Sequence, residues 1–351
     1  MLAYYNAGMT KMRVGLVFGG RSGEHEVSVR SAKSIYEALD KNKYEVELLG
    51  VDKTGQWHRM DQKWLPKGAE MKALPSGEKG LAVQEEKVDI FFPIIHGTFG
   101  EDGTLQGLFE LLDVAYVGAG VLGSAVGMDK DVQKRLLIQA GIPVANYVSL
   151  SLSTSSGNPK IPFKFPVFVK PANMGSSVGI SKIEKEIEVE KAIKLAFQYD
   201  TKVIVEEAVE GREIEISVLG NEEPTASLPG EVIPRGHEFY DYEAKYIDEN
   251  GAELVIPARL SAEQIKICQE LAVKTFKVLE CSCMARVDMF LTPEGKFVVN
   301  EINTLPGFTN ISMYPKLWEA TGIKYADLLD KLIRLALEKK KEKDKLKRSY
   351  S

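Results

Sequence analysis

Four polar residues on two neighbouring segments are the first candidates for chemistry in this chain. Arg286 and Asp288 lie two residues apart in the segment MARVDMFL, and Glu301 and Asn303 lie two residues apart in the segment KFVVNEIN. Because side chains alternate along a strand, each pair is expected on one face of its strand. The turn letters TPEG between the two segments predict a β-hairpin, which would bring the two polar faces together.

Such a hairpin would place one guanidinium beside three oxygen ligands. Carboxylate and amide oxygens suit Mg²⁺, which prefers a few carboxylates together with phosphate oxygens and water. The pattern therefore predicts an ATP–Mg²⁺ site. A half-exposed strand with solvated charges is the alternative for a single pair, whereas two facing pairs favour the site.

The composition is that of an ordinary globular enzyme of two or three domains. The chain has 351 residues, of which 44% are hydrophobic and 27% charged, and a net charge of -5. A net negative charge does not attract the phosphates of a nucleic acid, so we expect no nucleic-acid partner. No apolar run is long enough to predict a membrane span, and the start lacks a signal-peptide pattern, so a cytoplasmic enzyme is expected. The three cysteines fit buried thiols, with neither zinc spacing nor an even disulfide framework.

The N-terminal part predicts a Rossmann-like unit. A buried strand over 13–18 ends in the turn GGRSG, and a helix over 26–39 follows. Further strands are expected at 44–51 and 88–95, and ligands gather at the carboxyl ends of such strands. Glu24 in the first turn is either a ligand or a partner of the helix dipole. A lone histidine is usually structural, but His96 closes the third strand before a glycine-rich loop, a position that strengthens the case for a functional role.

The segment GAGVLG at 118–123 is the main rival signal. It has the spacing of a dinucleotide-binding turn, but no acidic residue follows about 20 residues later, as that fold requires. We interpret it as a tight turn that leads into a second domain near residue 128. An NAD-dependent oxidoreductase remains the alternative that this segment supports. No P-loop sequence occurs.

A second group of residues suits a bound nucleotide. The strand at 166–170 ends in Lys170 and is followed by the glycine- and serine-rich segment PANMGSSVGI, whose backbone N–H groups could hold phosphates. The strand at 203–205 runs into Glu206, Glu207, Ala208 and Val209. Their backbone groups could form hydrogen bonds with the edge of an adenine ring, and Glu213 could accept hydrogen bonds from ribose hydroxyls.

Two other segments are less specific. The stretch 239–246 (FYDYEAKY) is expected to be either a mobile active-site cover or a surface hairpin packed with tyrosines. A helix is expected at 325–338, and the charge run KKKEKDKLKR after it predicts a solvated helix end.

Six motifs together carry a family resemblance that covers about four fifths of the chain. They are GGRSGEHEVS (19–28), HGTFGEDGTLQG (96–107), KPANMGSSVG (170–179), YEAKY (242–246), ARVD (285–288) and NEINTLPG (300–307). In this order they resemble D-alanine:D-alanine ligase. The resemblance implies an α/β and α+β chain with the ATP-grasp fold and a Rossmann-like N-terminal domain. The expected parts are a leader (1–12), an N-terminal substrate domain (13–122), a central ATP-grasp lobe (123–207), a C-terminal lobe (208–340) and a charged tail (341–351).

The resemblance also implies a reaction, in which ATP phosphorylates one D-alanine and a second D-alanine attacks the acyl phosphate to give D-alanyl-D-alanine for peptidoglycan. Two Mg²⁺ ions are expected, replaceable by Mn²⁺, as is a homodimer. The implied catalytic residues are Glu24, Ser176, Tyr246, Arg286 and Gly307. The implied ATP-binding residues are Lys130, Lys170, Gly175, Ser176, Ser177, Glu206, Glu207, Ala208, Val209, Glu213 and Lys245. The implied metal ligands are Asp288, Glu301 and Asn303, and the implied substrate-binding residues are Glu24, His96, Arg286, Gly307, Ser312 and Met313.

Within this family, Tyr246 would join Ser176 and Glu24 in one closed unit, and its presence favours the dipeptide over a D-lactate product. D-serine or D-lactate as second substrate remains an alternative. A nucleotide-binding regulator without catalysis on the same fold is a further one, against which the complete set of implied metal ligands argues.

Overall fold

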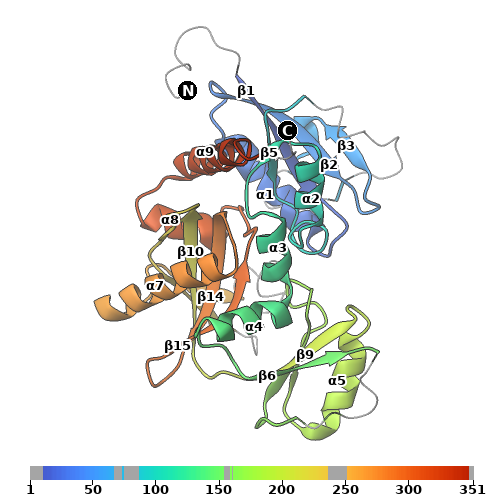
Figure 1. Ribbon diagram of the computed structural model, residues 1–351, viewed down its shortest axis with the longest axis vertical. Helices are drawn as coiled ribbons and strands as arrows, with labels where there is room; N and C mark the ends of the chain where they lie inside the picture. Colours follow the sequence, from blue (N-terminus) through green and yellow to red (C-terminus); the bar gives the residue numbers. More distant parts are fainter. Residues whose placement is uncertain are drawn as a thin grey trace.

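The protein is described by a computed structural model over residues 11–66, 73–74, 87–153, 159, 161–235 and 251–347. The described strands form three sheets, each with helices beside it (Figure 1). In Figure 1 the first sheet is blue and lies at the top, the central one is yellow-green at the bottom, and the third is yellow to orange. The predicted mixture of α/β and α+β structure is confirmed.

The first sheet has the strand order β3-β2-β1-β4-β5. Its strands run parallel except for β3, which pairs with β2 in the antiparallel sense at the edge. The short apolar strands are typical of parallel sheets that are buried on both faces. The elements are β1 Met12–Gly19, α1 His25–Ala38, β2 Tyr44–Val51, β3 Trp57–Met60, the 3₁₀ helix η1 Gln62–Trp64, β4 Ile90–Pro93, α2 Thr104–Leu111 and β5 Ala115–Tyr116. The sequence did not predict β3, because its segment WHRM is polar and becomes a strand only by pairing with β2.

The central lobe has its own sheet and its own core. Its strand order is β6-β9-β7-β8, with every pair antiparallel. Apolar residues of β7, β9 and α5 form a cluster that includes Val167, Val205 and Ala192. The elements are α3 Val121–Met128, α4 Lys130–Gln139, β6 Tyr147–Ser151, β7 Val167–Pro171, β8 Ser181–Ile183, the 3₁₀ helix η3 Glu186–Glu188, α5 Val189–Ala196 and β9 Lys202–Glu207.

The third sheet carries the predicted hairpin. Its strand order is β13-β12-β10-β14-β15, and β11 also pairs with β10. Helix α7 packs on one face, where Phe276 contacts the same apolar cluster as Val287 and Met289 of β14. The elements are β10 Arg212–Gly220, β11 Thr225–Ala226, β12 Gly230–Pro234, β13 Ala252–Val255, α7 Ala262–Val278, β14 Cys283–Leu291, β15 Phe297–Asn303, α8 Met313–Ala320 and α9 Tyr325–Lys343.

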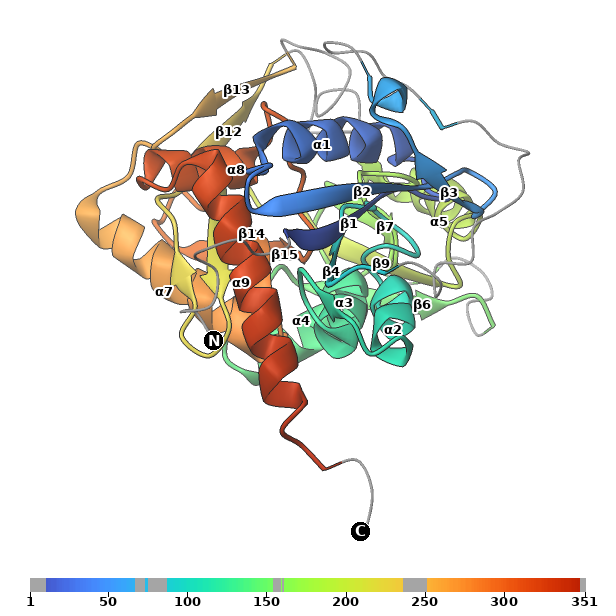
Figure 2. The same cartoon turned by 90° about the horizontal axis from the view of Figure 1, so that it is seen from above.

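Helix α9 joins the C-terminal lobe to the first sheet (Figure 2). Its buried face, with Leu328 and Leu332, shares one apolar cluster with Phe92 of β4 and with Met284 and Trp318 of the C-terminal lobe. The N-terminal domain and the C-terminal lobe therefore share a core. The four-stranded sheet and α5 of the central lobe have a separate one, whereas Leu137 of α4 packs into the cluster of the C-terminal lobe.

The end of α9 corrects one prediction. Lys339 was expected in a solvated helix end, but it is half-buried and its Nζ donates a hydrogen bond of 2.6 Å to Ser282 Oγ. Lys343 pairs with Glu110 of α2. The charge run thus holds α9 against both neighbouring parts of the molecule.

Candidate active site

The hairpin of β14 and β15 places the four predicted side chains on one face. The strands pair in the antiparallel sense, with Arg286 opposite Asn303 and Asp288 opposite Glu301. The alternate residues, such as Val287, are buried against α7, so the polar face lies on the other side of the sheet. The predicted meeting of the two polar pairs is confirmed.

Arg286 lies between two carboxylates at the centre of this face. Its Nε and Nη2 donate to the two oxygens of Asp288, each at 2.7 Å, and its Nε is also 3.0 Å from Oε2 of Glu215. Glu215 lies directly opposite Asp288 on the neighbouring strand β10. All three side chains are largely buried, with 14%, 13% and 7% exposed for Arg286, Asp288 and Glu215. The guanidinium is therefore fixed in orientation.

Lys130 connects the hairpin to the central lobe. Asp129 caps α4 by accepting hydrogen bonds from the backbone N–H groups of residues 131 and 132, so Lys130 begins the helix. Its Nζ donates to the carbonyl of Met174 at 2.8 Å and lies 3.5 Å from Oε2 of Glu301. One ammonium therefore reaches both the glycine- and serine-rich segment and a proposed metal ligand.

The donor set suits Mg²⁺ held together with a substrate. Among the described residues no group of three or more His, Cys, Asp and Glu side chains could hold a metal ion by itself. Asp288 and Glu301 supply carboxylate oxygens, and Asn303 adds an amide oxygen that now accepts from the N–H of Leu305 at 3.1 Å. Mg²⁺ usually takes one or two carboxylates and completes its shell with phosphate oxygens and water, so these residues fit it.

The segment after β7 closes onto the N-terminal domain. Ser176 and Ser177 have φ of 50° and 61°, in the left-handed region that side chains rarely adopt. Ser176 Oγ donates a hydrogen bond to Oε1 of Glu24. A Cβ at Gly175 would lie 3.1 Å from the other carboxylate oxygen of Glu24, so the glycine permits this close approach. The predicted meeting of Ser176 with Glu24 is confirmed.

His96 is buried near the same place. Its Nδ1 donates to the carbonyl of Leu305 at 3.1 Å and lies 4.0 Å from Oε1 of Glu101, which is also buried. Burial opposes the charged imidazole, but the carboxylates of Glu101 and Glu24 outweigh it and raise the pKa of His96. Burial, together with the charge of Glu24, raises the pKa of Glu101. His96 and Glu101 therefore both bind protons more strongly than free side chains do, under the influence of the nearby Glu24 carboxylate.

The proposed adenosine site lies at the end of β9. Glu206 is buried, and its Oε2 is 3.4 Å from the Nζ atoms of both Lys170 and Lys134. Burial alone would raise the pKa of Glu206, but these two ammonium groups hold it below its ordinary value. The other predicted residues here, Glu207, Ala208, Val209 and Glu213, are half-buried and follow along the chain into β10.

The predicted substrate residues after β15 form a tight turn. A Cβ at Gly307 would lie 2.8 Å from Ser312 Oγ, so a larger residue would collide with this hydroxyl. The same hydroxyl accepts from the N–H of Thr309 at 3.0 Å. The side chain of Met313 packs in an apolar cluster with Leu317. Lys245 and Tyr246 lie outside the described residues.

Three residues of this site were not predicted from the sequence: Lys134, Glu215 and Glu101. A local signal existed for two of them. Lys134 follows Lys130 by four residues and so lies on the same face of α4. Glu215 alternates with Glu213 along β10 and so shares its face. Glu101 carries no such signal, because only the tertiary structure brings it to His96.

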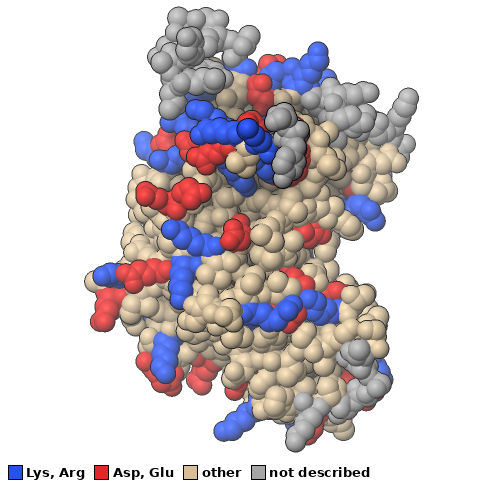
Figure 3. Space-filling view, in the orientation of Figure 1, with Lys and Arg blue, Asp and Glu red and all other residues tan. Residues whose placement is uncertain are grey.

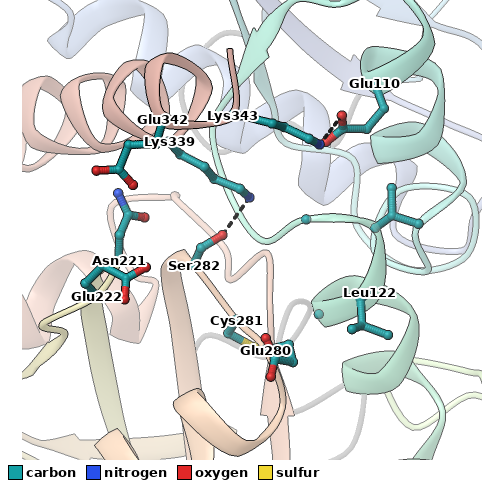
Figure 4. A pocket seen from close by; sticks show the side chains of 13 residues that line it. Glu110, Leu122, Asn221, Glu222, Glu280, Cys281, Ser282, Lys339, Glu342 and Lys343 are labelled. Carbon is teal, nitrogen blue, oxygen red and sulfur yellow. Dashed lines mark hydrogen bonds and ion pairs between the residues drawn. The ribbon is translucent and has the colours of Figure 1, made fainter. Parts of the chain in front are cut away.

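The glycine-rich segment at 118–123 lies elsewhere, beside a cavity of about 480 Å³ (Figure 4). The cavity is lined by residues that include Gly120, Leu122, Asn221, Ser282 and Lys339. A Cβ at Gly123 would lie 2.4 Å from the carbonyl oxygen of Glu280, so this glycine lets α3 pack against the C-terminal lobe. Close packing thus accounts for a glycine of the segment without a dinucleotide.

The charged side chains on the surface are mixed in sign. On the face seen in Figure 3, described Lys and Arg side chains lie among Asp and Glu, notably around α9 in the upper part. The helices of the described residues include none with the length and apolar character that crossing a membrane requires.

Comparison with known proteins identifies the family. A family model described as D-ala D-ala ligase N-terminus matches residues 13–119, and one described as D-ala D-ala ligase C-terminus matches residues 136–334. The chain belongs to the D-alanine–D-alanine ligase family. It is an enzyme, a ligase that forms a carbon–nitrogen bond. The resemblance drawn from the six sequence motifs is confirmed.

Members of this ligase family match over nearly the whole chain. A D-alanine–D-alanine ligase from Oceanobacillus iheyensis is 50% identical over 97% of this chain and 99% of its own length. The structure of the D-alanine-D-alanine ligase from Coxiella burnetii is 40% identical, with a TM-score of 0.83 over 95% of this chain and 96% of that one. A Bacillus anthracis D-alanine–D-alanine ligase complexed with ATP is 28% identical, with a TM-score of 0.76 over 95% of this chain and 99% of that one. The predicted ATP-grasp fold is confirmed by these neighbours.

Proposed function

We propose that this site joins two D-alanines into D-alanyl-D-alanine at the expense of ATP, to supply a peptidoglycan precursor. The observation that carries the proposal is the polar face of the β14–β15 hairpin. Arg286, Asp288 and Glu301 meet there, and Lys130 links Glu301 to the segment that precedes Ser176. A guanidinium, acidic ligands and a lysine in one place are what a phosphoryl-transfer site needs.

Amide formation in water is unfavourable, so the first carboxylate must be activated. ATP transfers its γ-phosphoryl group to the carboxylate of the first D-alanine and leaves as ADP. The amine of the second D-alanine then attacks the acyl phosphate, and inorganic phosphate departs as the C–N bond forms. Both steps build up negative charge, so stabilisation of that charge is the main catalytic demand.

The phosphate groups bind between the central lobe and the hairpin. Lys130 and Lys170 pair with them, and the backbone N–H groups around Gly175, Ser176 and Ser177 cover them. Asp288, Glu301 and Asn303 would hold two Mg²⁺ ions, or Mn²⁺ in their place, which would neutralise the phosphate oxygens when bound. The adenosine lies along Glu206, Glu207, Ala208 and Val209, with Glu213 on the ribose and Lys245 near the phosphates.

Arg286 and the N–H of Gly307 stabilise the oxyanion of the tetrahedral intermediate. Asp288 accepts hydrogen bonds from Nε and Nη2 of Arg286. If Asp288 coordinated a metal instead, the Nη2 donor would be free for the substrate, while Nε would keep its contact with Glu215 at 3.0 Å. The guanidinium would thus keep its place and still offer a donor to the substrate.

The substrate side lies against the N-terminal domain. Glu24 receives the ammonium of the first D-alanine, and His96 lies near its carboxylate. Ser312 and the backbone of Met313 border the second D-alanine. Tyr246 completes the closed unit with Ser176 and Glu24, which favours an amine over a hydroxy acid as the second substrate. The enzyme acts as a cytoplasmic homodimer.

The test is phosphate release from ATP by the purified protein, with each D-amino or D-hydroxy acid added singly. We expect turnover only with D-alanine and Mg²⁺ or Mn²⁺, and D-alanyl-D-alanine as the product by mass spectrometry. Rapid ATP cleavage without any D-amino acid, or a product with D-lactate in preference to D-alanine, would contradict the proposal.

A further inference from the structure

Lys134 is a buried lysine that no role in the proposed reaction accounts for. It lies on α4, one turn after Lys130, and its side chain is 1% exposed. Its Nζ is 3.4 Å from Oε2 of Glu206 and makes no hydrogen bond in the part of the chain that the structure describes. Lysine is almost never buried to this degree without a charged partner, so the pair with Glu206 holds it there.

A second lysine contacts the same oxygen. Lys170 Nζ donates to Oε2 of Glu206, also at 3.4 Å, and its side chain is 12% exposed. The two lysines differ in freedom. Lys170 lies next to the end of β7, beside the glycine- and serine-rich segment, whereas the Nζ of Lys134 lies under the ring of Tyr147, 5.9 Å from its centre. Only Lys170 is placed to leave Glu206 for a phosphate.

The departure of Lys170 would leave Glu206 with one cation. The Glu206 side chain is 4% exposed, and a buried carboxylate without a partner is strongly disfavoured. We propose that Lys134 is a positioning residue, which holds Glu206 ionised and in place as the acceptor for the exocyclic amine of adenine while Lys170 binds phosphate. This inference rests on the proposed ATP site.

The chemistry of Glu206 makes it a selector between purines. An ionised carboxylate accepts hydrogen bonds and donates none. Adenine carries an amine at its six position, where guanine carries a carbonyl oxygen. The Glu206 carboxylate, held in place by Lys134, attracts the amine of adenine and repels the carbonyl oxygen of guanine. Lys134 therefore affects the preference for ATP over GTP through Glu206.

The decisive variant is Lys134→Met, which keeps the length of the side chain and removes its charge. Binding of the non-hydrolysable analogues of ATP and GTP is measured by calorimetry in the presence of Mg²⁺, beside steady-state kinetics. We expect affinity for the ATP analogue to fall roughly tenfold or more, as for a lost charged hydrogen bond, while affinity for the GTP analogue does not fall, because the repulsion of guanine is weakened. The KM for ATP should rise while kcat at saturating ATP stays near that of the wild type.

Lys202→Met is the matched control. Lys202 lies in the same lobe and also pairs with two carboxylates, Asp129 at 2.5 Å and Asp131 at 3.3 Å. Neither carboxylate belongs to the proposed adenosine site, so this variant should keep the wild-type preference for ATP over GTP.

A double variant tests whether Lys134 acts only through Glu206, and it provides a protein that folds if Lys134→Met does not. Lys134→Met/Glu206→Gln removes both charges of the buried pair and leaves only Lys170, which is partly exposed, without its carboxylate partner, so it should fold even where Lys134→Met does not. Its preference for ATP should equal that of Glu206→Gln alone, because Lys134 acts only through Glu206.

Three results would overturn the inference: wild-type ATP affinity in Lys134→Met, equal losses for the ATP and GTP analogues, or a further tenfold loss in the double variant relative to Glu206→Gln. Absence of ATP binding in the wild-type protein would instead refute the proposed function. The two failures are therefore distinguishable.

Discussion

Replacement of Arg286 by lysine tests the oxyanion role most directly, because it keeps the charge and removes the shape. Arg286 forms a two-pronged contact with Asp288, two hydrogen bonds of 2.7 Å, and its Nε is 3.0 Å from Glu215. A lysine at this position offers a single nitrogen, so it can pair with either carboxylate but cannot reproduce the planar fork.

The size of the effect follows from the lost donors. A hydrogen bond to a charged group is worth about 1.5–3 kcal/mol, and each 1.4 kcal/mol corresponds to about tenfold in rate. The side chain is 14% exposed, so solvent compensates little for a lost donor. We therefore expect Arg286→Lys to reduce kcat by about ten- to a hundredfold, with the KM for ATP nearly unchanged.

Arg212→Lys is the matched control for this prediction. Arg212 of β10 donates from Nε and Nη2 to the two oxygens of Glu231, at 2.7 and 2.6 Å, in the same sheet. Its fork is of the same kind but belongs to no proposed catalytic contact. We expect Arg212→Lys to keep kcat, while both variants lose a similar small amount of thermal stability.

The assay is coupled ADP release with saturating D-alanine, beside thermal unfolding of each variant. Near-normal turnover of Arg286→Lys would refute the oxyanion role. An equal loss of turnover in Arg212→Lys would show that the sheet, rather than the guanidinium at the site, limits the rate.

Three further predictions concern the metal, the pH and the substrate. Asp288→Asn and Glu301→Gln should raise the Mg²⁺ concentration needed for half-maximal turnover while the melting temperature changes little; a collapse in melting temperature with normal turnover would make them structural. Burial opposes the charge of Asp52, but hydrogen bonds from Thr54 and His58 hold the pKa of its carboxyl well below the ordinary value. Its stabilisation is therefore present above about pH 4 and is lost as the pH falls through the lowered pKa, so Asp52→Asn should unfold more easily than the wild type at pH 7, and the difference should shrink only in strong acid. D-alanine should protect the protein against heat most when ATP is present, because the two substrates meet in one closed site; a scan with each ligand alone and with both checks this.

The local parts of the site could be predicted from the sequence, and the contacts between elements could not. Alternation and a turn sequence sufficed for the hairpin that joins Asp288 to Glu301. Glu215 was missed because β10 pairs with β14 across more than sixty residues, and no local pattern specifies that strand order. The meeting of Ser176 with Glu24, 152 residues apart, followed from family resemblance and not from spacing.

The division of the apolar cores predicts which parts of the enzyme unfold locally. One cluster unites the first sheet, α9 and part of the C-terminal lobe, whereas the four-stranded sheet and α5 of the central lobe depend on a smaller cluster of their own. Backbone amides of β7 and β9 should therefore exchange with solvent through local openings that leave the larger body folded. In the proposed site a bound nucleotide contacts both parts, so it should slow that exchange mainly in the four-stranded sheet. The proposed D-alanine surface would then keep its shape with the larger part, while the affinity for ATP would depend on the local stability of the smaller one.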